Sequence, residues 1–244
     1  MSARRAIAAA VAALAALVPA CGGRSAHAVT VFGAASLTGV LPELRQEFLR
    51  GRAGERITLD LAGTPQLVAQ IEAGAPADVV ATADEASLAE LRARRLLDGP
   101  PVVFARNRLA IAVRPGNPRH IRDLADLAQS GLVVVFADAR VPAGKYAAAA
   151  LGRAHVSVHP ASLEQDVKAV VAKVVLGEAD AGIVYVTDVR AAGGKVGGVA
   201  IAASDNVVAG YRIAAITARG RAFRDFVLSP DGQRVLRRAG FLSP

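Results

Sequence analysis

The chain repeats one local pattern, in which a short apolar strand ends at a small or hydroxyl residue and a helix then begins. The pattern occurs at 29–36 (VTVFGAAS), 57–64 (ITLDLAGT) and 133–143 (VVVFADARVPA). The first N–H groups of a helix have no partner within the helix, and the helix dipole adds partial positive charge, so such an end attracts an anion. The three junctions contain no Cys or His and almost no Lys or Arg. They therefore predict a small anion held by neutral donors, which favours binding over catalysis.

Composition sets the outer limits of the fold. The 244 residues are 53 % hydrophobic and 20 % charged, a globular profile with enough chain for one large or two modest domains. The formal net charge is +8, but the Arg residues alternate with Asp and Glu, and aromatic residues make up only 4 %. This pattern is typical of solvated helix faces, and we expect no nucleic-acid partner.

The N-terminal segment, residues 1–28, is predicted to be a targeting signal. Arg4 and Arg5 precede an apolar stretch, 6–18, that is too short to span a bilayer comfortably. Cys21, in the sequence VPAC, resembles the lipidated cysteine of a bacterial lipobox, which would tether an exported protein to the membrane. Cleavage after Ala28 is the alternative. Because the chain has one Cys, the exported part needs no disulfide.

Beyond the signal, apolar runs alternate with segments of helical periodicity, which predicts an α/β fold with mainly parallel sheets. The predicted strands are 29–33, 57–61, 78–82, 108–113, 132–136, 182–185, 198–202 and 211–217. The predicted helices are 38–50, 65–73, 85–95, 121–129, 142–153, 163–176 and 221–240, the last with a break near Pro230.

Two segments, 96–107 and 205–210, have the composition of connections between two lobes. We therefore expect lobe 1 to contain residues 29–106 and 209–244, and lobe 2 to contain residues 107–208. A small ligand would bind in the cleft between the lobes, near the carboxyl ends of the strands.

Several residues at the junctions are candidates for ligand contact. Ser36 ends the first strand, and Thr64 precedes Pro65 at the start of a helix. Either hydroxyl could equally serve only as a helix cap. Ala143 follows Pro142 at a helix start, where its N–H has no intrahelical partner. Tyr185 ends an apolar run, so its ring is expected to be buried and its hydroxyl to need a partner.

Five segments, in this order and spacing, resemble the molybdate-binding proteins of bacterial ABC importers. They are VFGAASLTGVL, GTPQLVAQIEAGAPADVVATAD, VPAGKYAAAAL, EQDVKAVV and ADAGIVYVTD. The resemblance implies a two-lobe type II periplasmic-binding-protein fold and capture of molybdate or tungstate. It also implies delivery to an ABC permease with its ATPase, at the outer side of the cell membrane, by a monomer without a cofactor. The oxyanion-binding residues that it implies are Ser36, Thr64, Ala143, Val167 and Tyr185.

The sequence departs from that pattern in one place. Thr64-Pro65 stands where the family commonly has Ser-Ser, so one hydroxyl and one N–H are missing. Lys145 lies two residues after Ala143, and we interpret it as a solvated side chain rather than a cation at the anion.

The chemistry of the ligand supports molybdate or tungstate as the bound anion. Molybdate, tungstate and sulfate are fully deprotonated and only accept hydrogen bonds, whereas phosphate keeps a proton that needs an acceptor. Asp166 adjoins Val167 and is expected to cap its own helix instead. Sulfate or another tetrahedral oxyanion is the alternative ligand.

A secreted hydrolase is the alternative of a different class. Ser36 lacks a G-x-S-x-G elbow and no His–Asp partners are identifiable. His155 and His159, in the alternating stretch HVSVH, would share one strand face, but no further metal ligand lies nearby in the sequence. We therefore expect no direct metal-ion ligands.

Overall fold

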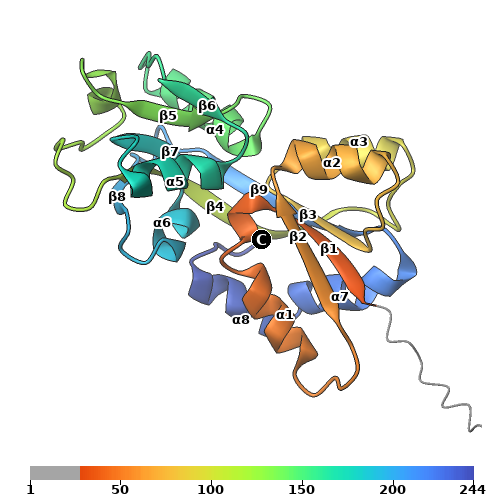
Figure 1. Ribbon diagram of the computed structural model, residues 1–244. Coiled ribbons are helices and arrows are strands. Elements are labelled where there is room, and N and C mark those ends of the chain that lie inside the picture. The colour runs from red at the N-terminus through yellow and green to blue at the C-terminus, as the bar shows by residue number, and fades with distance from the viewer. Residues whose placement is uncertain (1–27) are drawn as a thin grey trace, which may run out of the picture.

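The structure is a computed structural model that describes residues 28–244 (Figure 1). The signal segment and Cys21 lie outside the described residues. The strands are β1 (Val29–Ala34), β2 (Ile57–Ala62), β3 (Val79–Thr82), β4 (Val102–Val113), β5 (Val134–Ala137), β6 (Ser162–Glu164), β7 (Ala181–Tyr185), β8 (Gly197–Ala200) and β9 (Val208–Ala215). The α-helices are α1 (Leu41–Leu49), α2 (Thr64–Glu72), α3 (Ala86–Ala93), α4 (Pro142–Arg153), α5 (Val167–Leu176), α6 (Val186–Ala191), α7 (Arg221–Leu228) and α8 (Pro230–Ala239). Three short 3-10 helices are η1 (Ala35–Leu37), η2 (Ala125–Ala128) and η3 (Ala218–Gly220).

Within residues 28–244 the strands form one nine-stranded sheet in the order β2-β1-β3-β9-β4-β7-β5-β6, with β8 paired to β4. The pairs at the two ends of the order are parallel: β1 with β2 and β3, and β5 with β6 and β7. The pairs of β4 and β9 are antiparallel. The predicted α/β class is confirmed. The strands at each end of the order pair in parallel as predicted, but the antiparallel pairs of β4 and β9 make the sheet as a whole mixed.

Strand β4 changes partners along its length. Its first part, Val102–Arg108, pairs with β9, and its second part, from Leu109, pairs with β7 and β8. Figure 1 shows the consequence: β4 and β9 run between a group that contains β1, β2 and β3 and a group that contains β5, β6 and β7. The long β4 begins well before the predicted start at Arg108, because its first half is a strand in its own right against β9.

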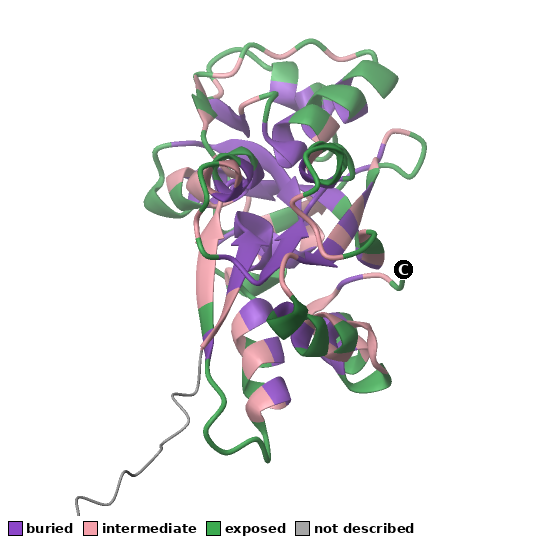
Figure 2. Ribbon diagram, turned by 90° about the vertical axis from the view of Figure 1, so that its right-hand side faces the viewer, coloured by how far each residue is buried: buried purple, intermediate pink, exposed green. Residues whose placement is uncertain are grey.

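Helices cover both faces of the sheet. On one face of β1, β3 and β9, apolar residues of α2 and α3 pack against the strands and form a separate small core. It includes Phe32 of β1, Leu67 of α2 and Leu88 of α3. On the other face, Phe48 of α1 packs edge-on against Phe223 of α7, with ring centroids 5.4 Å apart. At the other end, α4 and α5 pack against β5 and β7. Figure 2 shows the result, with the central strands buried and the outer helix faces exposed.

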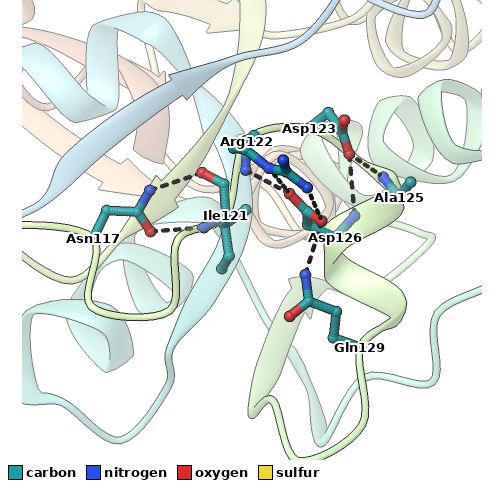
Figure 3. Close-up of polar contacts among 7 residues, drawn as sticks. All are labelled: Asn117, Ile121, Arg122, Asp123, Ala125, Asp126 and Gln129. Carbon is teal, nitrogen blue, oxygen red and sulfur yellow. Dashed lines mark hydrogen bonds and ion pairs between the residues drawn. The ribbon is translucent and has the colours of Figure 1, made fainter.

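The predicted helix at 121–129 is wrong over most of its length, since only η2 is helical there. Side chains hold the preceding backbone in turns (Figure 3). Asn117 donates through Nδ2 to the carbonyl of Ile121 (2.7 Å) and accepts from its N–H (3.0 Å). Asp126 accepts from the N–H of Arg122 at 2.8 Å. Such side-chain bonds offer the backbone partners that compete with a regular helix.

Other boundaries also differ from the prediction. The segment predicted as a helix from Leu163 begins with strand β6 (Ser162–Glu164), and α5 starts only at Val167. The last predicted helix is two helices, α7 and α8, separated at Ser229 as the Pro230 signal indicated. The prediction missed the short helix α6. His155 and His159 lie in a turn and an irregular segment rather than on one strand, and His155 has a positive φ of 54°.

Candidate functional site

One small cavity lies where the predicted junctions meet. It is lined by Ala34, Ala35, Ser36, Gly63, Thr64, Ala83, Val141, Pro142, Ala143, Asp166, Val167 and Tyr185. All five oxyanion-binding candidates are in this set, although they come from separate segments of the sequence.

Ser36 lies in η1, immediately after β1, and is 5 % exposed. Its hydroxyl oxygen accepts a hydrogen bond from the hydroxyl of Tyr211 at 2.9 Å. No side-chain hydrogen bond caps η1. The sequence left open whether Ser36 caps a helix or faces a ligand, and the structure gives its oxygen a buried tyrosine as partner beside the cavity.

Thr64 is the first helical residue of α2, whereas the sequence suggested it as the N-cap. The N-cap is Gly63, and no side-chain hydrogen bond caps this helix. Gly63 lies close to the opposite side of the cavity, because a Cβ atom at this position would lie 2.8 Å from the carbonyl oxygen of Gln165. The Thr64 hydroxyl is not the cap of α2, because Gly63 occupies the N-cap position. The short distance between Gly63 and Gln165 shows that the cavity is narrow here.

Ala143 is the second residue of α4, which starts at Pro142 as predicted and has Val141 as its N-cap. The N–H of Ala143 belongs to the first turn and has no intrahelical partner. Gly144 allows the helix start to approach the end of β5, since a Cβ there would collide with the carbonyl oxygens of Ala137 and Asp138. The close packing places the start of α4 at the cavity.

Asp166 and Val167 form the start of α5. The carboxylate of Asp166 accepts from the N–H of Ala169 at 2.9 Å and so caps the helix, as the sequence predicted. Val167 is the first helical residue, and its N–H has no partner within the helix. An amide donor thus stands at the cavity beside a carboxylate that is engaged in capping.

Tyr185 ends β7 and is 1 % exposed. Its hydroxyl has no hydrogen-bond partner among the described residues. Burial raises the pKa of this hydroxyl well above 10, so it stays protonated and can donate. A buried polar group without a partner costs about 1–3 kcal/mol, so such a group beside a cavity points to a ligand.

The cavity contains donors but no cation of its own. None of its lining residues is Lys, Arg or His. Lys145 is exposed and is not among them, in agreement with the solvated side chain that the sequence predicted. Lys168 Nζ is 3.0 Å from the buried carboxylate of Asp188, so its charge is already balanced. The groups that this site offers to an anion are hydroxyl groups, backbone amides and the positive ends of helix dipoles.

The sequence reasoning missed Tyr211. It lies in β9, is 0 % exposed, and contacts Ser36 through its hydroxyl. The signal was the same one that selected Tyr185, because a tyrosine on a buried strand needs a partner for its hydroxyl. What could not be predicted was that β9 passes next to η1, since the two are 175 residues apart in sequence.

A two-part sheet with a cavity that is lined by donors, has no cation in its lining and lies where helix starts converge is the architecture of a solute-binding protein. The model of the family described as bacterial extracellular solute-binding protein matches residues 29–242. The chain belongs to this family.

Particular relatives are also similar. The molybdate-binding protein ModA of Mycobacterium tuberculosis is 35 % identical over 226 residues, which is 91 % of this chain and 87 % of the relative. The periplasmic molybdate-binding protein of Azotobacter vinelandii has the same fold, with a TM-score of 0.78 at 19 % identity, covering 88 % of this chain and 99 % of that one. The sulfate-binding protein SubI of Mycobacterium tuberculosis has a TM-score of 0.79 at 19 % identity, covering 88 % and 86 %.

Among the helices of residues 28–244, none combines the length and the apolar composition that crossing a bilayer requires.

Proposed function

We propose that this protein captures molybdate or tungstate outside the cytoplasm and delivers it, as a monomer, to the permease and ATPase of an ABC importer. The molybdate-binding name of the 35 % identical relative supports the choice of ligand. The observation that carries the proposal is the fully buried Tyr185 hydroxyl, which has no partner among the described residues and belongs to the lining of the cavity.

In this proposal the anion accepts hydrogen bonds from both side chains and backbone. Ser36, Thr64 and Tyr185 donate through their hydroxyls, and Ala143 and Val167 donate through their amides. The starts of α2, α4 and α5 add the positive ends of their dipoles. A fully deprotonated dianion uses every donor, whereas hydrogen phosphate would turn a proton toward one of them.

We propose that the chain is divided into lobe 1, residues 29–106 and 209–244, and lobe 2, residues 107–208. The change of partner within β4 between Arg108 and Leu109 supports this boundary. Hinge motion at the two connecting strands would then open and close the cavity, and the closed liganded form would be the one that docks on the permease.

A binding role is favoured over a hydrolase. The only partner that Ser36 Oγ has among described side chains is the Tyr211 hydroxyl. Tyr211 is itself buried, which raises its pKa and keeps its proton in place, so it is a poor general base. No His lines the cavity. Sulfate is the second candidate ligand, because the sulfate-binding protein SubI shares the fold and sulfate is also a fully deprotonated tetrahedral dianion.

Isothermal titration with molybdate, tungstate, sulfate and phosphate tests the proposal. We expect tight binding of molybdate and tungstate, much weaker binding of sulfate because a rigid set of donors fits one oxyanion size, and the weakest binding for phosphate. Sulfate binding as tight as molybdate binding would overturn the assignment of the ligand.

A further inference from the structure

The hydroxyl groups of Tyr211 and Ser36 form the polar contact that links β9 to the cavity. Tyr211 donates to Ser36 Oγ at 2.9 Å, and both residues are buried, with exposures of 0 % and 5 %. Ser36 lines the cavity, whereas Tyr211 does not. The polar route from the Tyr211 hydroxyl to a bound ligand therefore runs through Ser36.

A serine hydroxyl has one proton to donate and two lone pairs that accept. When Tyr211 places its proton on a lone pair of Ser36, the Ser36 proton has to point elsewhere, and the cavity lies beside it. We infer that Tyr211 is a positioning and specificity-determining residue that commits Ser36 to donating toward the oxyanion. The inference rests on the proposed function, because it concerns the same site.

The surroundings of Tyr211 hold its hydroxyl in place. Its ring makes edge-on contacts with Tyr185, Phe104 and Phe241, with centroid distances of 5.7, 6.2 and 5.3 Å. Its backbone pairs with Ala105 of β4. A ring enclosed by three aromatic neighbours keeps one orientation, so the hydroxyl is aimed at Ser36 before any ligand enters.

The consequence is selection by protonation state. A committed donor at Ser36 is matched by molybdate, tungstate or sulfate, which offer only acceptors. It is mismatched by inorganic phosphate, which carries a proton at neutral pH and needs an acceptor at one of its oxygens. Without the Tyr211 hydroxyl, Ser36 can rotate and accept that proton. The Tyr211 hydroxyl of the wild-type protein therefore contributes to affinity for deprotonated oxyanions and to rejection of protonated ones.

A double-mutant cycle measured by isothermal titration with molybdate tests the inference. Tyr211→Phe removes one hydroxyl and keeps the ring, and we expect it to weaken molybdate binding by about three- to tenfold. In the Ser36→Ala background the same substitution should change the dissociation constant by less than about twofold, because the group it acts through is gone. Independent, additive effects of the two substitutions would overturn the inference.

Tyr146→Phe is the matched control. It also removes a tyrosine hydroxyl near the site, but that hydroxyl donates to the carbonyl of Ala83 and not to Ser36. Its effect should be the same with and without Ser36→Ala. A structural disturbance of the site would instead make both tyrosine variants behave alike in the cycle.

Phosphate gives a second arm that does not depend on additivity within the cycle. Both Tyr211→Phe and Ser36→Ala should weaken the binding of molybdate more than the binding of phosphate. The dissociation constant for phosphate divided by the dissociation constant for molybdate should therefore fall in each variant. An unchanged ratio in both would contradict the inference. Failure of wild-type protein to bind molybdate would instead defeat the proposed function, so the two failures are distinguishable.

Discussion

The hydroxyl of Tyr146, in α4, donates to the backbone carbonyl of Ala83, just after β3, at a distance of 3.2 Å. Helix α4 packs on β5 and β7, whereas Ala83 follows β3 in the other part of the sheet, and the two residues meet next to the cavity, which Ala83 lines. Burial raises the pKa of Tyr146 to about 12, so the hydroxyl is a donor throughout the physiological range. This contact therefore bridges the two proposed lobes.

Tyr146→Phe should favour the open form. A neutral hydrogen bond contributes about 0.5–1.5 kcal/mol, so we expect oxyanion binding to weaken by about two- to tenfold, mainly through faster dissociation. Stopped-flow dissociation and titration measure this. Because Tyr146 is not among the cavity-lining residues, molybdate and tungstate should be weakened by the same factor. Loss of affinity for one of them alone would argue against a bridge between lobes.

Tyr185→Phe tests the buried hydroxyl directly. A hydrogen bond to a charged acceptor is worth about 1.5–3 kcal/mol, which corresponds to weakening of molybdate binding by roughly ten- to a hundredfold. The ring still fills its place, so the melting temperature without ligand should change little. Ala143→Gly is the control, because glycine supplies the same backbone N–H and should cost little affinity. An unchanged dissociation constant for Tyr185→Phe would remove the hydroxyl from the site.

Gly63→Ala tests whether the two sides of the cavity must approach closely. The backbone of Gly63, with φ of −56°, accepts alanine, but the added Cβ would lie 2.8 Å from the carbonyl oxygen of Gln165. We expect molybdate binding to weaken by about tenfold or more, since overpacking costs about 1–3 kcal/mol. The melting temperature without ligand should be retained, because the proposed opening of the lobes would separate these groups in the unliganded protein.

Gly152→Ala, in α4, is the matched control for that variant. A Cβ there meets nothing within 4 Å, so binding should be unchanged and stability equal or higher. If Gly63→Ala binds molybdate as tightly as this control does, the cavity closes without the close approach at Gln165.

Asp180 should give the fold a stabilising contribution that depends on pH. Burial alone would raise the pKa of this carboxyl, but hydrogen bonds from Arg119 and from the N–H of Val133, together with the charges of Arg119 and Arg114, hold it below its usual 3.8. A depressed folded-state pKa stabilises the protein above the unfolded-state pKa, and the contribution is lost as the pH falls through the folded-state value.

We therefore expect Asp180→Asn to lower the free energy of unfolding by about 1–3 kcal/mol at pH 7. The difference from wild type should shrink as the pH falls below about 4. Urea denaturation at several pH values measures it. Asp225→Asn is the control, because Asp225 pairs with Arg224 at the surface with 60 % of its side chain exposed, and such pairs contribute little. A difference for Asp180→Asn that stays constant down to pH 3 would contradict the assignment.

The prediction of membrane attachment depends on lipidation of Cys21. Expression in a bacterial host should place the wild-type protein in the membrane fraction, and Cys21→Ala should release or misprocess it, because a lipid chain attaches only through the thiol. Fractionation and N-terminal sequencing measure this. A wholly soluble wild-type protein that begins at Val29 would show cleavage after Ala28 instead.

Local signals in the sequence determined most of the elements. Periodicity and the Pro142 start predicted α4 over its full length, and Pro230 marked the break between α7 and α8. The carboxylate of Asp166 was expected to cap α5, and it does. These features depend on residues within a few positions of one another, so the sequence alone contains the physical information that decides them.

Only the tertiary structure decided which distant residues meet. Tyr211 reaches Ser36 because only β3 separates β9 from β1 in the sheet, and Tyr146 reaches Ala83 because β4 and β9 join the two ends of the sheet. The turns at Asn117 and Asp126 replaced a helix that the apolar periodicity favoured, since their side chains bond the backbone directly. The apolar pattern shows which face of a segment is buried. The partner of a buried hydroxyl is decided by packing between segments that the chain connects only through the whole fold.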